Sequence, residues 1–165
     1  MTDIRREERP HALRLDLPAA HSAGRMARGM VRQFALAEGL PELEVDTIEF
    51  VAGELLDNAV DHGGGGGARE VAELPRDVRM ILGLEVVDGE WKVTVHDQGG
   101  GAPEDLRRLI TPPDELPDLE DERGRGFFLL GQMVDELSVS QSDDGLGLAL
   151  CARRRTQQDP TGDGD

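Results

Sequence analysis

The sequence predicts an α+β fold, a two-layer sandwich with helices on one face of a mostly antiparallel sheet. Stretches with apolar residues at helical spacing are interspersed with stretches in which apolar and polar residues alternate. The alternating stretches come in neighbouring pairs joined by short turns, as antiparallel strands do. Because the 165 residues show no change of composition along the chain, we expect one domain.

The composition excludes several classes of function. Thirty-four acidic residues against eighteen basic ones give a net charge of −16, which repels nucleic acid phosphates and anionic lipids. The single cysteine cannot form an internal disulfide, and the charged N-terminus lacks the apolar core of a signal peptide. No apolar run approaches the ~20 residues of a membrane span. We therefore expect a cytoplasmic protein that binds neither nucleic acid directly nor a membrane.

The first part of the chain predicts a strand and two helices. Residues 1–10 are charged and without pattern, which indicates a flexible arm, and residues 11–17 alternate as a half-buried strand does. Residues 20–38 carry an apolar stripe at helical spacing, and Gly39 ends that helix. Residues 41–62 form the longest helical stretch, which opens with a proline where a helix does not need the missing N–H.

The middle of the chain predicts an insertion and a hairpin. Residues 63–77 begin with five glycines and continue with polar residues, so we expect a mobile surface insertion that holds no fixed turn. Residues 78–86 and 91–97 alternate on either side of Asp88-Gly89, which is a strong hairpin signal. Residues 102–110 then predict a short helix.

The last part of the chain predicts a loop, a helix and a second strand pair. Three prolines and six acids preclude regular structure over residues 111–122. A helix is expected over residues 127–136, and two strands between residues 137 and 150. The polar residues 154–165 predict a disordered tail, which leaves residues 11–153 as the folded domain.

The longest helix carries the candidate chemistry. Glu54, Asn58 and His62 are four residues apart and form a row beside the apolar stripe. At the margin of a buried face, the carboxylate would accept a proton from an attacking hydroxyl, and the carboxamide oxygen would bind Mg²⁺.

The hairpin ends in a candidate base-binding turn. Asp97 alternates in phase with the apolar residues of the strand before it, so we expect this acid to point to the buried side. Its carboxylate would accept a hydrogen bond from an exocyclic amine. Gly99 and Gly101 would let a base approach the backbone without interference from a Cβ atom.

A second glycine pair predicts the phosphate side of the same site. Gly124 and Gly126 precede a helix, where backbone N–H groups and the helix N-terminus would meet phosphates. Arg123 and Arg125 add positive charge at this point. Together with the acid, the amide and the base-binding turn, this pair predicts a site for a nucleotide with Mg²⁺.

Each feature has a plainer explanation when it is taken alone. A glutamate or an asparagine on a helix is most often a solvated residue, an Asp-Gly turn is most often only a turn, and a glycine pair most often only a helix entry. His62 falls toward the apolar arc and is expected to pack or to cap, and Cys151 receives no role. The nucleotide site is favoured because the features occur together and in order.

These segments resemble those of a known family. ELLDNAVDH (residues 54–62), DQGGG (97–101) and RGRGFFLL (123–130) look like the N, G1 and G2 boxes of the gyrase and histidine-kinase type (GHKL) ATPase superfamily. Within it, the short chain and the histidine four residues after the asparagine are most similar to bacterial anti-sigma-factor serine/threonine kinases. The resemblance covers residues 11–153.

The resemblance implies a serine/threonine protein kinase that binds ATP and Mg²⁺. Such a protein holds a sigma factor inactive and phosphorylates an anti-anti-sigma antagonist protein, which regulates transcription in the stress response. Members of the family pair as dimers, so a homodimer is expected.

The resemblance also implies roles for individual residues. Glu54 would be the general base, Asn58 the Mg²⁺ ligand and Asp97 the adenine anchor. Gly99 and Gly101 would form the turn beside the base. Arg123, Gly124, Arg125 and Gly126 would form the phosphate side of an ATP lid that spans residues 111–126.

Two departures from the family pattern leave alternatives open. Residues 63–77 exceed the expected short connection, and Leu146-Gly147 stands where such proteins often carry a Gly-Thr pair near the adenine-binding acid. The alternative is a non-catalytic ATP-binding module that sequesters a partner protein. A detached ATP-binding domain of a histidine kinase ranks last, because no phosphoacceptor helix pair precedes residue 11.

Overall fold

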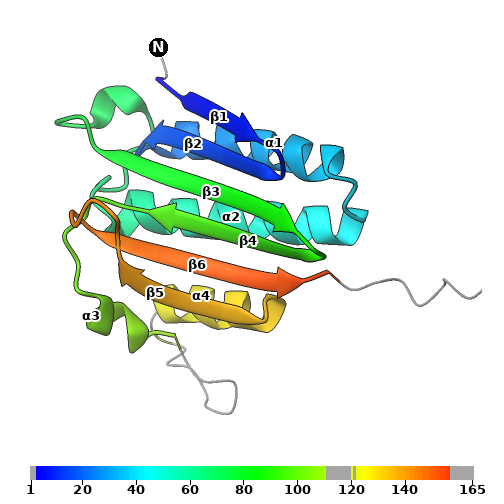
Figure 1. Ribbon diagram of the computed structural model, residues 1–165. Helices are drawn as coiled ribbons and strands as arrows, with labels where there is room; N and C mark the ends of the chain where they lie inside the picture. The colour runs from blue at the N-terminus through cyan, green and yellow to red at the C-terminus, as the bar shows by residue number, and fades with distance from the viewer. Residues whose placement is uncertain (1–2, 111–119, 121, 157–165) are drawn as a thin grey trace, which may run out of the picture.

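The computed structural model describes residues 3–110, 120 and 122–156. These residues form a six-stranded sheet in the order β1-β2-β3-β4-β6-β5, with every neighbouring pair antiparallel. The elements are β1 (Arg5–Arg9), β2 (Ala12–Pro18), α1 (His21–Ala37), α2 (Glu42–His62), the short 3-10 helix η1 (Val71–Glu73), β3 (Arg79–Val87), β4 (Glu90–His96), α3 (Pro103–Arg107), α4 (Glu122–Met133), β5 (Glu136–Gln141) and β6 (Leu148–Arg155). Helices α1, α2 and α4 cover one face of the sheet (Figure 1), which confirms the predicted fold class.

The core lies between the sheet and these helices. Leu82 of β3 lies opposite Leu15 of β2 and Val95 of β4, and all three side chains are buried. Helix α2 adds Ile48 and Leu55 to the same layer. Each such leucine contributes about 1.5–3 kcal/mol by burial, so the alternation in the strands and the stripe on α2 hold the two layers together.

Helices α1 and α2 form an antiparallel hairpin, and their bounds lie within one residue of the predicted ones. Gly39 ends α1 in a left-handed conformation with φ of +80°. The N–H of Gly39 donates to the carbonyl of Leu36 and that of Leu40 to the carbonyl of Ala35. This pattern is a Schellman motif, which explains why a glycine is needed at this position.

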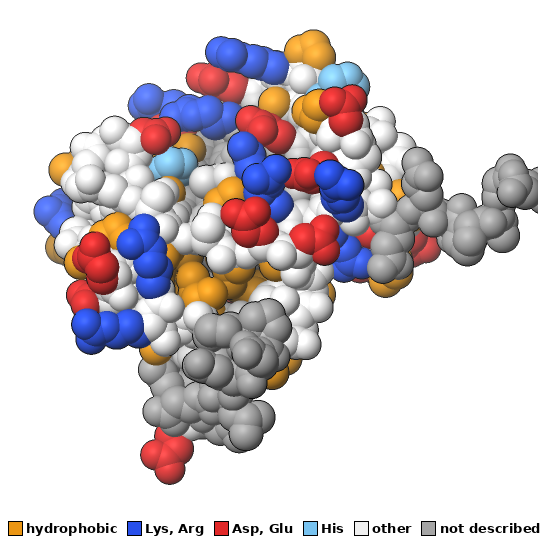
Figure 2. Space-filling model, turned by 60° about the horizontal axis from the view of Figure 1, so that its bottom comes forward, with side chains coloured by type: hydrophobic (Ala, Val, Ile, Leu, Met, Phe, Trp, Pro, Cys, Tyr) orange, Lys and Arg blue, Asp and Glu red, His pale blue; other side chains and the backbone are white. Residues whose placement is uncertain are grey.

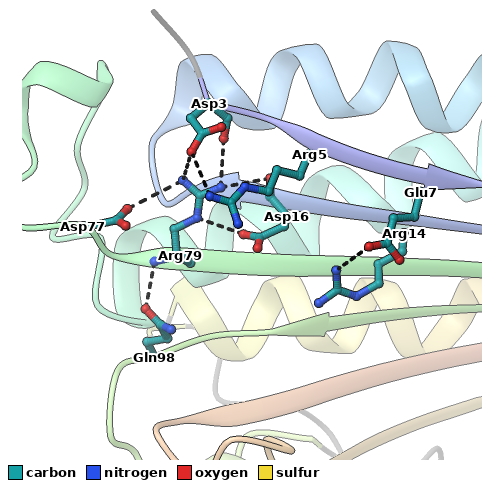
Figure 3. Close-up of polar contacts among 8 residues, drawn as sticks. All are labelled: Asp3, Arg5, Glu7, Arg14, Asp16, Asp77, Arg79 and Gln98. Carbon is teal, nitrogen blue, oxygen red and sulfur yellow. Dashed lines mark hydrogen bonds and ion pairs between the residues drawn. The ribbon is translucent and has the colours of Figure 1, made fainter.

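The expected flexible arm at residues 1–10 is wrong for its second half, because β1 pairs with β2 at the edge of the sheet. Every residue of β1 is exposed, so the strand has no apolar face and left no alternating pattern. Arg79 anchors the N-terminus (Figure 3), since it donates to the Asp16 carboxylate at 2.8 Å and to the Asp3 carbonyl at 2.8 Å. The charged side chains of an edge strand also discourage pairing with another chain.

The glycine run after α2 takes a fixed path, contrary to the expectation that it holds no fixed turn. A Cβ atom at Gly65 would lie 2.5 Å from the Ala19 carbonyl oxygen, so this backbone passes directly against the connection between β2 and α1. The carbonyl of Ala68 accepts the N–H of His21, which satisfies an N–H that the helix itself leaves unpaired. The mobility of the whole segment 63–77 stays a prediction.

Two boundaries near the end of the chain differ from expectation. Helix α4 begins at Glu122 and ends at Met133, so the glycine pair lies inside the helix and not before it. Most of the expected lid, residues 111–119 and 121, lies outside the described residues.

Strand β6 continues to Arg155, so residues 154 and 155 do not belong to a disordered tail. Arg154 takes a position that faces the helices, where it lies 3.6 Å from the buried Glu44 carboxylate. The other oxygen of Glu44 accepts the indole N–H of Trp91 at 2.8 Å. Because this buried acid balances the arginine, the strand continues without the apolar residue that the pattern required.

The β5 edge of the sheet is covered by α3. Arg107 donates a hydrogen bond to the carbonyl of Val139 at 3.1 Å.

Figure 2 views this side of the molecule and shows hydrophobic side chains gathered in a central hollow, with acidic and basic side chains around it. The excess of negative charge is therefore not concentrated as one patch on this face.

Candidate functional site

A pocket of about 380 Å³ lies between α2 and α4. Its lining residues are Glu54, Asp57, Asn58, Asp61 and His62 of α2 and Glu122, Arg123, Gly126, Phe127 and Leu130 of α4. The structure therefore brings together the helical row and the second glycine cluster that the sequence singled out.

Glu54 points across the pocket toward α4. A Cβ atom at Gly126 would lie 3.9 Å from the Glu54 carboxylate, so the glycine leaves open space in front of the acid. Burial raises the pKa of the Glu54 carboxyl above its usual value, the negative charge of Asp57 raises it further, and Arg28 opposes both. A carboxylate with a raised pKa holds a proton more readily, which suits a general base.

Asn58 is buried and only half satisfied. The Asn58 Oδ1 accepts a hydrogen bond from Arg123 Nε at 2.9 Å. The Arg123 guanidinium in turn lies 5.8 Å from the centroid of the Phe127 ring. The buried Nδ2 of Asn58 has no hydrogen-bond partner within the described part of the chain. A buried donor without an acceptor is costly, so the amide is suited to a ligand that offers oxygen atoms.

Asp97 lies directly after β4 and is buried, as the alternation predicts. Its Oδ1 accepts the backbone N–H groups of Gly99 and Leu148, both at 3.0 Å. A Cβ atom at Gly147 would collide with this oxygen, so glycine is required there. The carboxylate is thus fixed by backbone donors from a turn and from β6.

The Asp97 turn lies against the end of α2. A Cβ atom at Gly99 would lie 2.7 Å from the carbonyl carbon of Gly63, and the N–H of Gln98 donates to the Gly63 carbonyl at 3.3 Å. At Gly101 the tightest contact of such an atom is 3.2 Å, with the flexible Leu148 side chain, so the steric need for glycine is weaker. Since Gly63 follows the last pocket residue of α2, the turn and the pocket meet at one end of this helix.

The phosphate-side residues occupy the first turns of α4. Gly124 is buried, Gly126 lines the pocket, and Arg125 is exposed to solvent. The helix N-terminus is near Glu122, five residues earlier than the sequence predicted.

Sequence reasoning missed several residues of the site. His62 was expected to pack or cap, but it is exposed at the pocket. Asp57 and Asp61 also line the pocket, and their i, i+4 spacing on the same helix as Glu54 was the available signal. Gly63 and Gly147 left no signal, because their steric role depends on contacts with distant segments.

Helices over an antiparallel sheet, with an acid and an amide facing a glycine-bearing helix beside a buried aspartate, define a nucleotide-binding domain of the GHKL type. The model of the histidine kinase-like ATPase domain matches residues 17–153, and the chain belongs to this family. Membership implies that the domain binds ATP. No curated protein matches the chain.

The fold is similar to that of a chain in the crystal structure of the SiaB-SiaC complex from Pseudomonas aeruginosa. The TM-score is 0.64 at 18% sequence identity, and the match covers 85% of this chain and 87% of the other. At this identity the likeness concerns the fold. Among the described residues, no helix combines the length and the apolar character that a membrane span requires.

Proposed function

We propose that the protein is an ATP-dependent serine/threonine protein kinase and an anti-sigma factor. It sequesters a sigma factor and phosphorylates an anti-anti-sigma antagonist protein in the cytoplasm. The observation that carries the proposal is the pocket between α2 and α4, where Glu54 and Asn58 face Arg123 and Gly126.

Glu54 would act on the protein substrate. Its carboxylate, with the pKa raised by burial, accepts the proton of a serine or threonine hydroxyl. The hydroxyl oxygen then bonds to the γ-phosphorus, the bond to the bridging oxygen breaks, and ADP leaves. Gly126 leaves room for this approach, because a side chain there would stand in front of Glu54.

Asn58 and Asp97 would hold the two ends of the nucleotide. Asp97, which two backbone N–H groups hold in place, would accept a hydrogen bond from the exocyclic amine of adenine. Mg²⁺, held by the Asn58 oxygen together with phosphates and water, would supply positive charge beside the γ-phosphate. Arg123 now donates to that oxygen, so it would exchange this hydrogen bond for one to a phosphate.

Phosphate transfer tests the catalytic part of the proposal. Purified protein, labelled ATP and Mg²⁺ are incubated with candidate antagonist proteins. Glu54→Gln is expected to reduce transfer by about 10²–10⁴-fold while ATP binding is retained, because the base is lost and the pocket keeps its shape. Transfer at the wild-type rate by this variant would contradict the role of Glu54.

Protein partners are supported by the match to a structure that is itself a complex of two proteins. We expect a homodimer that binds the sigma factor, and light scattering of the protein with and without candidate sigma factors measures both. A monomer at micromolar concentration would contradict the dimer.

The alternative is an ATP-binding module without catalysis that sequesters a partner. Two observations favour it: Arg123 occupies the oxygen expected to bind Mg²⁺, and Gly147 stands where a threonine was expected near Asp97. In this case Glu54→Gln would leave partner capture unchanged, and no phosphoprotein would form with any antagonist.

A further inference from the structure

The pocket contains more negative charge than nucleotide binding requires. Besides Glu54 and Glu122, the carboxylates of Asp57 and Asp61 line it. Each acid repels a triphosphate and competes with Asn58 for Mg²⁺. Neighbouring groups must therefore hold the two aspartates away from the triphosphate or offset their charge.

Helix α1 pairs with both aspartates from behind the pocket. Arg28 Nη2 donates to Asp57 Oδ2 at 2.9 Å. His21 Nδ1 lies 3.2 Å from Asp57 Oδ1, and His21 Nε2 lies 2.8 Å from Asp61 Oδ1. The His21 ring therefore lies between the two carboxylates, with one ring nitrogen toward each of them.

Gly53 makes room for this arrangement. It lies in the interior of α2, where glycine weakens a helix. A Cβ atom at Gly53 would lie 2.5 Å from Arg28 Nε and 2.6 Å from Arg28 Cζ. The glycine therefore lets the guanidinium lie flat against α2 and reach Asp57.

We propose that Arg28 and His21 are positioning residues for ATP binding, which by pairing with Asp57 and Asp61 hold these carboxylates toward α1, while the Arg28 guanidinium offsets the charge of Asp57 beside the triphosphate. This inference rests on the ATP binding that the proposed function requires. It explains how an acidic pocket accepts an anionic ligand, and why α2 carries a glycine one turn before Asp57. Asp57 raises the pKa of Glu54 and Arg28 lowers it, so both charges of the pair act on a carboxyl group that lines the pocket.

Isothermal titration calorimetry with Mg·ATP tests the inference. Arg28→Gln leaves Asp57 without its cation, and we expect about threefold to tenfold weaker binding. Arg28→Gln combined with Asp57→Asn is expected to bind as the wild type does, because the unpaired charge is removed as well. His21→Gln and its combination with Asp61→Asn test the second pair in the same way. Arg32→Gln is the control, since Arg32 pairs with Asp46 and Glu49 away from the pocket.

A second variant displaces Arg28 without deleting it. Gly53→Ala places a methyl group where the guanidinium lies, and a flexible side chain moves aside at little cost. We expect weaker ATP binding with an unchanged or higher melting temperature, because alanine favours the helix. Gly29→Ala in α1 is the matched control, since its Cβ atom would meet nothing within 4 Å.

The outcomes separate this inference from the proposed function. Wild-type binding by both Arg28→Gln and Gly53→Ala would overturn the inference, and so would a failure of Asp57→Asn to restore binding. Phosphate transfer then remains as a separate measurement. If the wild-type protein itself binds no Mg·ATP, the proposed function falls and the inference falls with it.

Discussion

The two halves of the candidate site are held in different ways. Asp97 is fixed by backbone N–H groups from a turn and from β6, both at 3.0 Å. Within the part of the chain that the structure describes, the Asn58 side chain is held by one side chain, Arg123, which comes from another helix. Backbone donors in a sheet cannot rotate away, whereas an arginine has many rotamers. The base side is therefore preformed, and the phosphate side is free to rearrange when a ligand enters.

Asp97→Asn removes the acceptor on the preformed side and should have the largest effect. The amide oxygen can still accept the two backbone N–H groups, but the new NH₂ group cannot accept an adenine amine. We expect a loss of about 1.5–3 kcal/mol in the free energy of Mg·ATP binding, measured by calorimetry. Asp105→Asn in α3 is the control, and an unchanged affinity for Asp97→Asn would contradict the adenine role.

Gly147→Ala tests whether the base side is rigid. The added methyl group would collide with Asp97. The backbone of Asp97 has little freedom to move away, because its N–H donates to the Leu148 carbonyl. We expect the free energy of unfolding in urea to fall by about 1–3 kcal/mol, as overpacking does in a rigid site. Gly83→Ala is the matched control in β3, because its Cβ atom would meet nothing within 4 Å. Equal stability of the two variants would mean that the Asp97 turn is as adjustable as the pocket.

Arg123→Ala removes the hydrogen bond to Asn58 on the adjustable side. The free energy of unfolding should fall by about 0.5–1.5 kcal/mol, the usual contribution of one hydrogen bond. Hydrogen exchange should become faster along α4 and stay unchanged at the amides of Gly99 and Leu148. Arg107→Ala, which removes the bond to Val139, is the control and should leave α4 exchange unchanged. Faster exchange at the Asp97 turn would show that the two halves are coupled.

The sequence predicted those parts of the molecule that depend on periodicity. The stripe on α2 placed Glu54 and Asn58 at the margin of the core, and alternation in β4 placed Asp97 on the buried side. Both predictions hold because burial requires the same period over several turns or residues.

The remaining features depend on contacts between distant segments. Residues of β1 are exposed on both faces, so no apolar pattern marks an edge strand. Arg154 replaces an apolar residue in β6 because Glu44 lies opposite it, 110 positions earlier in the chain. The glycines at 63, 65 and 147 resemble flexible linker residues until the neighbouring backbone is known. Sequence patterns therefore predict which residues are buried, but they do not show where a close contact with a distant segment requires glycine.

Glu54→Gln should have the smallest effect on stability, with a sign that reports on function. Burial and the charge of Asp57 raise the pKa of Glu54 in the folded state, so ionising this carboxyl costs more in the folded than in the unfolded protein. The unfavourable contribution of ionised Glu54 is absent below the unfolded pKa of about 4.3, grows as the pH rises toward the folded pKa, and is complete above it. Glutamine removes that contribution, so the variant should be more stable than the wild type at pH 7.5, by less than about 1 kcal/mol because the side chain is partly exposed.

Thermal unfolding between pH 4 and pH 8 measures this difference. The gain in melting temperature of Glu54→Gln should shrink toward zero as the pH falls to about 4, where the wild-type carboxyl is protonated in both states. Glu49→Gln is the control on the same helix, and it should lose stability or stay unchanged because it gives up its bond to Arg32. A loss of stability in Glu54→Gln at pH 7.5 would mean that ionised Glu54 does not destabilise the folded protein. A gain would identify Glu54 as a residue retained for chemistry at the expense of stability.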